Sequence, residues 1–335
     1  MERYQILWRK NSGGKAEVLR VYAESAKVTI PEALEGCRVS AIAPYCFSSA
    51  SHIPEGDHFL TVGEGSSGEA EGKQMRVSTV DMRELAGNLV EEVTLPSTVR
   101  KLGASAFYNC KKLKRMVTGA SLADVGSDAF MNTIDFHEMT LLCSAGEKTG
   151  LKQILAQISS DMEVTFQGRE GIEAVLLYPE YDESYDEIAP AHLFGRNITG
   201  EGFRARQGFK EGVVDFGAYD KVFPQACVEE SEKILSKMAL NRLMYPFGLT
   251  EKNSRMYREY LESHVENLAG DAVRARKLEI LRFLCEDGLL TGSKLKRTIN
   301  FATETEWVEG AAELMHIHAG QEAKRGSGGY EFEDF

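Results

Sequence analysis

Hydrophobic and polar positions between residues 92 and 142 follow a pattern that recurs every 23 residues. In its first unit, Val93 and Leu95 alternate with polar residues, which predicts a short strand with one buried face. Pro96 then ends the strand, because proline provides no N–H for a strand ladder. The pairs that match at this single offset are Val93 and Met116, Leu95 and Thr118, Val99 and Leu122, Leu102 and Val125, Gly103 and Gly126, Ala106 and Ala129, Phe107 and Phe130, Asn109 and Asn132, and Leu113 and Phe136. A period of about 20–29 residues is typical of leucine-rich repeats.

The second half of each unit predicts how the chain returns to the core. Val99 and Leu102 are again apolar, and Gly103 permits a turn that a Cβ atom would disfavour. One unit cannot bury its own apolar edge, so neighbouring units must stack into a continuous solenoid core, with Phe107 inside it. A looser first unit lies upstream of the main series. Its apolar residues Val39, Ile42 and Phe47 each stand 60 residues before their counterparts in the unit described here.

The segment from Leu95 to Met116, LPSTVRKLGASAFYNCKKLKRM, carries a family signature. It resembles the BspA-like leucine-rich repeat, whose usual form is close to LPxxLxxIGxxAFxxCxxLxxI. The resemblance covers about residues 28–142. It implies a right-handed solenoid with one strand per repeat on a concave sheet, and it commonly implies binding to proteins or cell surfaces.

The predicted repeat domain extends over residues 1–145. Two extra strands precede its first unit, and an insertion follows that unit. Two strands, Tyr4 to Arg9 and Glu17 to Tyr22, are expected to close the N-terminal end of the solenoid. Residues 54–88 interrupt the repeat register as an insertion. Within it, Gly63 to Gly68 matches GxGxxG, but the acidic stretch that follows has no apolar helical stripe and would repel a phosphate. We therefore interpret this segment as a surface loop.

Residues 146–190 predict a small α/β segment that caps the C-terminal edge of the solenoid. A helix is expected from Gly150 to Ile158, with its apolar residues on one face. Strands are expected over Met162 to Phe166 and Ala174 to Tyr178. The acidic, tyrosine-rich stretch from Tyr178 to Pro190 is interpreted as a linker, because its carboxylates lack the spacing of a Ca²⁺ loop.

The hydrophobic period becomes helical in residues 191–320, which we expect to form an all-α domain. Short connections between the apolar stripes favour antiparallel helical hairpins of an ankyrin-like or TPR-like kind. One predicted helix ends at Gly270, and Asp271 is placed to cap the next helix. The polar, glycine-bearing residues 321–335 predict a disordered tail. The expected fold class is therefore α+β, with a leucine-rich repeat solenoid, an α/β cap and a helical domain.

Charge and cysteine usage limit the classes of partner and compartment. The net charge of −12 argues against a general nucleic-acid or anionic-membrane binder. No apolar run approaches the roughly 20 residues of a membrane span. The first residues lack an apolar core of signal-peptide length, and the six cysteines show no CxxC spacing. We expect a reduced, cytoplasmic protein.

No catalytic motif such as HExxH or GxSxG occurs in the sequence, and we expect no cofactor or metal. The glycine-bearing segment Gly195 to Gly202, with Arg204 and Arg206, is either a plain loop or an anion cradle. An enzyme with a site between the two domains, around His192, Arg196 and Arg204, stays open as an alternative.

The leading hypothesis is a non-enzymatic scaffold that binds a protein partner on the concave repeat sheet and on the helical domain. The residues that the 23-residue period stacks on the solvent face of this sheet are Glu92, Arg115 and Glu138 in one row and Thr94, Val117 and Thr140 in the next. Opposite charges on adjacent strands also stabilise a sheet, by about 0.2–1 kcal/mol per pair, so a purely structural role is the competing interpretation. A cell-surface adhesin of the BspA-like type is a further alternative.

Overall fold

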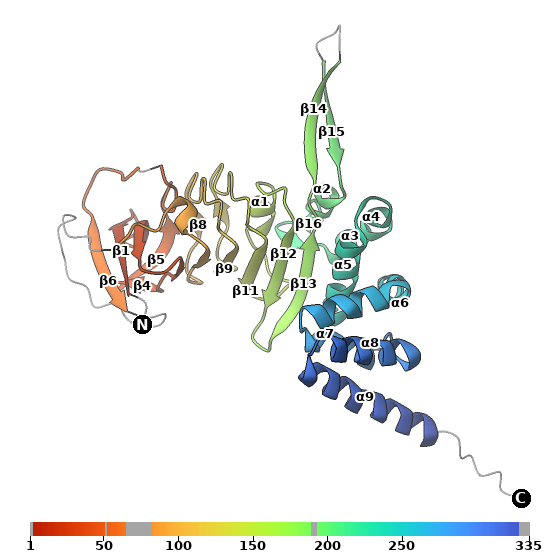
Figure 1. Ribbon diagram of the computed structural model, residues 1–335. Coiled ribbons are helices and arrows are strands. Elements are labelled where there is room, and N and C mark those ends of the chain that lie inside the picture. Colours follow the sequence, from red (N-terminus) through yellow and green to blue (C-terminus); the bar gives the residue numbers. More distant parts are fainter. Residues whose placement is uncertain (1–2, 51, 65–81, 189–192, 328–335) are drawn as a thin grey trace, which may run out of the picture. The chain divides into compact units, whose positions relative to one another are not determined.

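The computed structural model describes residues 3–50, 52–64, 82–188 and 193–327 (Figure 1). The chain divides into two compact units. The first, here called the repeat unit, comprises Met1–Glu230 with Tyr245–Gly248, and the second, the helical unit, comprises Ser231–Met244 with Leu249–Phe335. This corrects the expected start of the helical domain at residue 191, because residues 191–230 contribute to the repeat unit.

Six strands form the first sheet of the repeat unit. In spatial order these are β3 (Lys27–Thr29), β7 (Glu92–Thr94), β9 (Arg115–Gly119), β11 (Glu138–Leu142), β12 (Met162–Gln167) and β13 (Ile172–Tyr178). Neighbouring strands are parallel except for the last pair, β12 and β13. Val93 lies opposite Met116, and Met116 opposite Met139, so the predicted 23-residue register is confirmed.

The second sheet contains the return strands of the repeats and the N-terminal strands. In spatial order these are β10 (Asp124–Val125), β8 (Lys101–Leu102), β5 (Cys37–Ile42), β2 (Ala16–Ala23), β1 (Arg3–Lys10) and β6 (Phe59–Glu64), while β4 (Ala33–Leu34) pairs with β5 alone. The β1–β2 hairpin therefore closes this sheet beside the first repeat, as expected from its sequence. Strand β6, from the predicted insertion, pairs with β1 and covers its outer edge. Gly65 to Gly68, in the GxGxxG segment, lie outside the described residues.

Aromatic rings at equivalent repeat positions form the core of the solenoid. Phe47, Phe107 and Phe130 are stacked in order, with centroids 4.8 and 5.4 Å apart. Phe136, which occupies the repeat position of Leu113, extends the stack within the same coil at 5.3 Å from Phe130. All four side chains are at most 1% exposed. The same period that repeats the backbone strands thus also repeats the buried rings.

Helix α1 (Leu151–Leu155) caps the last repeat through its glutamines. The side chain of Gln153 accepts a hydrogen bond from the Val125 amide and donates one to the Ala123 carbonyl, at 3.0 and 2.9 Å. Gln157, just beyond the helix, donates to the Gly126 carbonyl at 3.0 Å. Backbone groups at the open edge of β10 are thereby satisfied, which is what a capping segment must achieve.

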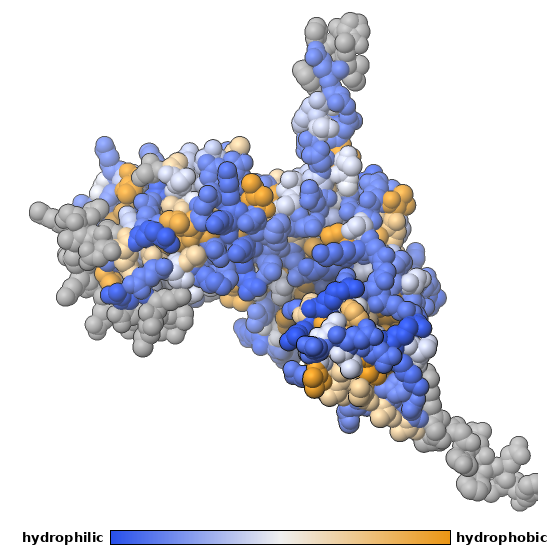
Figure 2. Space-filling view, in the orientation of Figure 1, coloured by the Kyte–Doolittle hydropathy of each residue, from blue (hydrophilic) through white to orange (hydrophobic). Residues whose placement is uncertain are grey.

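A two-stranded antiparallel arm projects from the repeat unit beyond the cap (Figure 1). It consists of β14 (Asp182–Ile188) and β15 (Leu193–Thr199). This corrects the interpretation of Tyr178 to Pro190 as a linker. The strands pair with each other and expose mostly polar side chains, so the sequence carries none of the apolar alternation that marks a half-buried strand (Figure 2).

Short elements connect the arm to the helical unit. These are α2 (Gly202–Ala205), β16 (Phe209–Lys210), β17 (Val213–Val214), α3 (Phe216–Asp220) and α4 (Phe223–Glu229). Within the repeats, the 3₁₀ turn η1 (Gly87–Leu89) precedes β7. Asp215 caps α3 by accepting a hydrogen bond from the Ala218 amide at 3.0 Å.

The helical unit contains α5 (Glu232–Met244), α6 (Glu251–Arg274), α7 (Leu278–Glu286), α8 (Gly292–Glu304) and α9 (Val308–Ser327). Helices α5 and α6 pack together, as do α8 and α9. Among the described residues, no helix is long and apolar enough to span a membrane.

Two helix ends differ from the sequence-based expectation. Helix α6 continues through Gly270 and ends only near Arg276, whose backbone is left-handed with φ of 52°. Packing of buried Ala269, Ala272 and Val273 keeps the helix intact across the glycine. Helix α9 also extends through Ser327, so the tail predicted to be disordered from residue 321 is helical over its first seven residues. Residues 328–335 lie outside the described part.

Candidate binding groove

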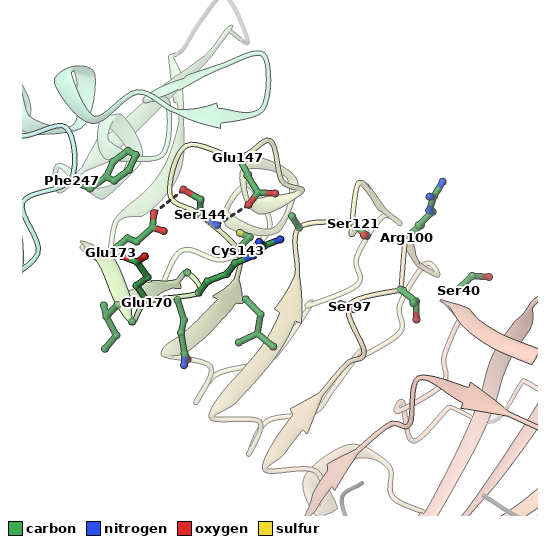
Figure 3. Close-up of a pocket in the computed structure, with 18 of the residues that line it drawn as sticks. Ser40, Ser97, Arg100, Ser121, Cys143, Ser144, Glu147, Glu170, Glu173 and Phe247 are labelled. Atoms are coloured by element: carbon green, nitrogen blue, oxygen red, sulfur yellow. Dashed lines mark hydrogen bonds between the residues drawn. The ribbon is translucent and has the colours of Figure 1, made fainter. Parts of the chain in front are cut away.

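An open groove with a volume of about 1320 Å³ runs along the repeat unit, where each coil turns from the first sheet to the second. Its lining comes from successive coils, from the β1–β2 turn and from the β12–β13 turn (Figure 3). The polar lining residues are Lys15, Arg38, Ser40, Ser97, Thr98, Arg100, Ser121, Ser144, Glu147, Gln167, Arg169, Glu170 and Glu173. We call this feature the corner groove.

Hydroxyl groups repeat along the floor of the corner groove. Thr98, Ser121 and Ser144 are spaced by 23 residues and so occupy the same position in three consecutive coils. Thr98 donates a hydrogen bond to the Val39 carbonyl at 2.7 Å, and Ser144 donates to Glu173 at 2.7 Å. Among the described residues, Ser121 has no side-chain partner and is exposed. Coils in a parallel sheet are about 4.8 Å apart, so the hydroxyls form a ladder with that spacing.

Three cations lie at the N-terminal end of the corner groove. Arg38 belongs to β5, and Lys15 immediately precedes Ala16, which pairs with Val39 of β5. Arg100 lies on the other side of β5 and donates its backbone N–H to the Ser40 carbonyl at 2.9 Å. All three side chains are exposed, and none has an ion-pair or hydrogen-bond partner within the described part of the chain. This end of the groove therefore presents an uncompensated positive charge.

Carboxylates gather at the opposite end of the groove. Glu173 accepts hydrogen bonds from the Ser144 hydroxyl at 2.7 Å and from the Ala145 amide at 3.0 Å, and these bonds lower the pKa of its carboxyl group. Glu147 accepts from the Ser144 amide at 2.9 Å. Glu170 is exposed on the β12–β13 turn. Figure 3 shows these three carboxylates on one side, Arg100 and Ser40 on the other, and Ser97 and Ser121 between them.

The six residues predicted as a protein-binding surface lie in two rows on the first sheet. Glu92, Arg115 and Glu138 are direct cross-strand neighbours. Thr94, Val117 and Thr140 form the adjacent row. The charges of the first row are paired within the sheet, since Arg115 donates to Glu138 at 2.5 and 2.8 Å and Glu92 pairs with Lys27 of β3. The predicted register is confirmed, and the binding role of these residues stays a prediction.

The two described arginines of the hypothetical enzyme site, Arg196 and Arg204, each pair with a different glutamate. Arg196 makes a two-pronged ion pair with Glu183 across the arm at 2.7 and 2.8 Å, which lowers the pKa of that carboxyl. Arg204 pairs with Glu201 at 3.1 Å. The third residue, His192, lies outside the described residues. The described side chains contain no group of three histidines, cysteines or carboxylates placed to hold a metal ion.

Arg206 is held inside the repeat unit instead of at an anion-binding surface. It is 3% exposed and donates to the carbonyls of Ile158, Ser160, Pro179 and Gly202 at 2.5 to 3.0 Å. Burial lowers the pKa of its guanidinium to about 10, and the group stays charged at neutral pH. These hydrogen bonds connect Pro179 and Gly202, at the base of the arm, to Ile158 and Ser160 in the cap. Gly195 to Thr199 lie in β15, so the proposed anion cradle is not a loop over most of its length.

All six cysteines are unpaired. Burial raises the pKa of the Cys110 and Cys143 thiols to about 12, and it also raises that of Cys46. The thiolate is the nucleophilic form, so these groups are inert at neutral pH. Cys143 therefore lines the corner groove as a small apolar residue.

The fold defines the repeat unit as a leucine-rich repeat solenoid. Residues 79–160 match the family described as "BspA type Leucine rich repeat region (6 copies)". This segment is therefore a BspA-type leucine-rich repeat region, and the resemblance seen in the sequence is confirmed.

Two solved structures of leucine-rich repeat proteins are similar to parts of the chain. A leucine rich cell surface protein from Faecalibacterium prausnitzii is 16% identical, over 50% of this chain and 42% of its own, with a TM-score of 0.26. A Leucine Rich Repeat protein from T. pallidum is 16% identical, over 42% of this chain and 70% of its own, with a TM-score of 0.21. The chain thus spans less than half the length of the first of these proteins. No protein with a curated description matches the chain.

Sequence analysis did not identify the corner groove. Its charged residues come from positions as distant as Lys15 and Glu173, and only the coiling of the chain brings them to one edge. The sequence contains one signal of the groove, its row of hydroxyls, because Thr98, Ser121 and Ser144 follow the same 23-residue offset as the buried positions.

Proposed function

We propose that this chain is a non-enzymatic protein-binding scaffold, and that its corner groove receives an extended polypeptide segment. The observation that carries the proposal is a row of hydroxyls bordered at one end by Lys15, Arg38 and Arg100, which have no side-chain partner among the described residues, and at the other end by carboxylates. Leucine-rich repeat solenoids typically bind proteins on the continuous surfaces that their stacked repeats create.

The chemistry of the corner groove suits a polypeptide backbone. The Ser121 hydroxyl can donate to a peptide C=O and accept from a peptide N–H, whereas Ser97, which donates to Glu32 at 2.9 Å, can accept from a peptide N–H. The coils from Arg38 to Arg169 are separated by four steps of about 4.8 Å, or about 19 Å in total, which corresponds to about six extended residues. An extended chain is therefore the shape that fits along the row.

The solvent face of the first sheet is a weaker candidate for the same role. Its charges at Glu92, Arg115 and Glu138 are engaged in ion pairs within the sheet, so a partner would have to replace interactions that already exist. We also propose that the helical unit provides a second face for binding a protein partner.

A peptide selection tests the proposed function. A displayed library of random nonapeptides is selected on the immobilised full-length chain, and the affinity of the enriched peptides is measured by fluorescence polarisation. Ser121→Trp places a large ring in the groove and is expected to weaken binding at least about tenfold. Ser127→Trp is the matched control, because Ser127 is an exposed serine of the same coil outside the groove lining. Equal affinities for both variants, or no enriched peptide, would contradict the proposal.

We further propose that the chain works in a reducing compartment such as the cytoplasm. The support is that all six thiols are unpaired, including the exposed Cys227. Fractionation of the native host with thiol trapping is the test. Recovery of the protein at the cell surface with oxidised cysteines would contradict this location and favour the adhesin alternative.

A further inference from the structure

The charges of the corner groove are separated along its length. Lys15, Arg38 and Arg100 mark the end beside β2, β5 and β8. Glu147, Glu170 and Glu173 mark the end beside β11, β12 and β13, where Arg169 is the one cation among the described lining residues. The lining residues in the middle of the groove, Ser97, Thr98 and Ser121, are uncharged, and the Ser97 hydroxyl donates a hydrogen bond to Glu32 at 2.9 Å. On a chain whose net charge is −12, a cluster of three cations is a local reversal of sign.

The two ends lie on different coils. The coils of Arg38 and Glu170 are about 19 Å apart and those of Arg100 and Glu147 about 10 Å apart, against a Debye length of about 10 Å at 0.1 M salt. Screening therefore weakens the attraction between the cations at one end and the carboxylates at the other. Since Lys15, Arg38 and Arg100 have no partner among the described residues, their charges are available to a ligand at little cost in broken contacts.

Two carboxylates of the acidic end accept hydrogen bonds from the turn at Ser144. Hydrogen bonds from Ser144 and Ala145 lower the pKa of Glu173, and Glu147 is held by the Ser144 amide. Glu170 adds a third carboxylate on the neighbouring turn. A nucleic acid would meet repulsion over this half of the groove, because each of its units carries a phosphate. A small anion would use only the basic half.

We propose that the corner groove selects polypeptide segments of bipolar charge, with acidic residues over Lys15, Arg38 and Arg100 and basic residues over Glu147, Glu170 and Glu173. This inference rests on the proposed function, since it specifies which segments the groove prefers. The uncharged lining at Ser97, Thr98 and Ser121 accepts small polar residues, and about six extended residues span the coils from Arg38 to Arg169.

Synthetic peptides test the charge preference directly. The fluorescein-labelled peptide DDDSSSKKK has separated charges, and DKSDKSDKS has the same composition with mixed charges. The full-length chain is expected to bind the first at least about fivefold more tightly, because only that peptide meets opposite charge at both ends. The difference is expected to shrink between 50 and 500 mM NaCl, as screening weakens exposed ion pairs.

A variant that changes one end should change the preferred ligand. Arg38→Glu with Arg100→Glu makes both ends acidic, so this protein is expected to prefer KKKSSSKKK over DDDSSSKKK. The control is Lys111→Glu with Lys112→Glu, which makes the same change of net charge at exposed positions outside the groove lining. That control is expected to keep the preference of the parent.

The outcomes separate this inference from the proposed function. If library-selected peptides lose affinity with Ser121→Trp but DDDSSSKKK and DKSDKSDKS bind equally, the groove binds peptides and the charge inference is wrong. The inference is also overturned if neither synthetic peptide binds, or if both double variants shift the preference alike. If no library peptide depends on Ser121, the proposed function fails as well.

Discussion

Phe107 and Phe130 stack with their ring centroids 5.4 Å apart and their planes 8° from parallel. They occupy the same position in consecutive coils, and each is at most 1% exposed. Phe47 continues the stack on the other side of Phe107, at 4.8 Å. The 23-residue period of the sequence is thus expressed as a column of rings through the interior of the solenoid.

Removing the central ring should destabilise the whole repeat unit. Phe107→Ala loses the transfer free energy of the ring and leaves a cavity between two others, with an expected cost of about 3–5 kcal/mol in unfolding free energy. Lys112→Ala is the control, because Lys112 is an exposed residue of the same coil, and its effect should stay within about 0.5 kcal/mol. Urea unfolding of the three proteins is the measurement. Equal, small effects would mean that the ring column does not hold the solenoid together.

Two glycines permit the close approach of neighbouring coils. A Cβ atom on Gly103 would lie 2.2 Å from the Pro44 nitrogen, and one on Gly126 would lie 2.4 Å from the Ala104 nitrogen. Because both contacts are with backbone, Gly103→Ala and Gly126→Ala should each cost about 1–3 kcal/mol or more. For Gly146→Ala the nearest atom is the edge of the Phe247 ring at 3.5 Å, and thermal melts should show almost no change. A similar melting temperature for all three variants would argue against this coil spacing.

The buried thiol of Cys110 should make stability depend on alkaline pH. Its pKa in the folded protein is about 12, against an ordinary value of 9.0, because burial disfavours the thiolate. A raised pKa means that folding favours the protonated form, so its contribution is complete below about pH 9 and is lost as pH rises towards 12. Between pH 9 and 10.5 the loss for one thiol is about 2 kcal/mol.

Comparison of Cys110→Ala with the parent isolates this effect. In reducing buffer, urea unfolding at pH 7.5 and 10.5 should show a smaller alkaline loss for Cys110→Ala than for the parent. Cys227→Ala, at an exposed position, should lose stability nearly as the parent does. An identical pH dependence for Cys110→Ala and the parent would show that the thiol is not held in its protonated form by folding.

Arg206 should be needed to hold the base of the arm. Its guanidinium donates to four backbone carbonyls, and Arg206→Met would remove this donor from those of Ile158, Ser160 and Pro179, at an expected cost of about 1–3 kcal/mol or more. Arg3→Met is the control, because it removes an ion pair with Glu24 in which both side chains are exposed, and it should cost little. Hydrogen exchange over Asp182–Ile188 and Leu193–Thr199 should accelerate in the first variant alone. Unchanged exchange in both would show that the arm is held independently of Arg206.

The parts of the fold that the sequence predicted are those in which burial repeats. Val93, Met116 and Met139 are apolar at one offset because they fill the same place in successive coils, and the cap helix shows its apolar face in the same way. Strand β14 shows no such pattern, since its residues pair with β15 on an exposed arm and are not selected for burial. The end of α6 was misplaced because tertiary packing outweighs the weak preference of Gly270 against a helix.

The corner groove depends on information that a linear pattern does not contain. Arg38 and Arg100 are close because β5 and β8 are neighbours in the second sheet, which the sequence indicated only through the 60-residue offset. Glu170 reaches the same groove through the β12–β13 turn, whose position depends on how the cap packs. The hydroxyl row was predictable from the period, and the charges at its ends were not.

Photo-crosslinking tests the central claim, that the corner groove and not the sheet face binds the partner segment. Benzoylphenylalanine is introduced at Ser121 in the groove or at Val117 on the solvent face of β9, four residues away. Each protein is irradiated with the library-selected peptide, and the products are mapped by mass spectrometry. The proposal predicts a peptide adduct at position 121 that unlabelled peptide suppresses, and none at position 117. Adduct formation at position 117 alone would contradict it and assign binding to the first sheet.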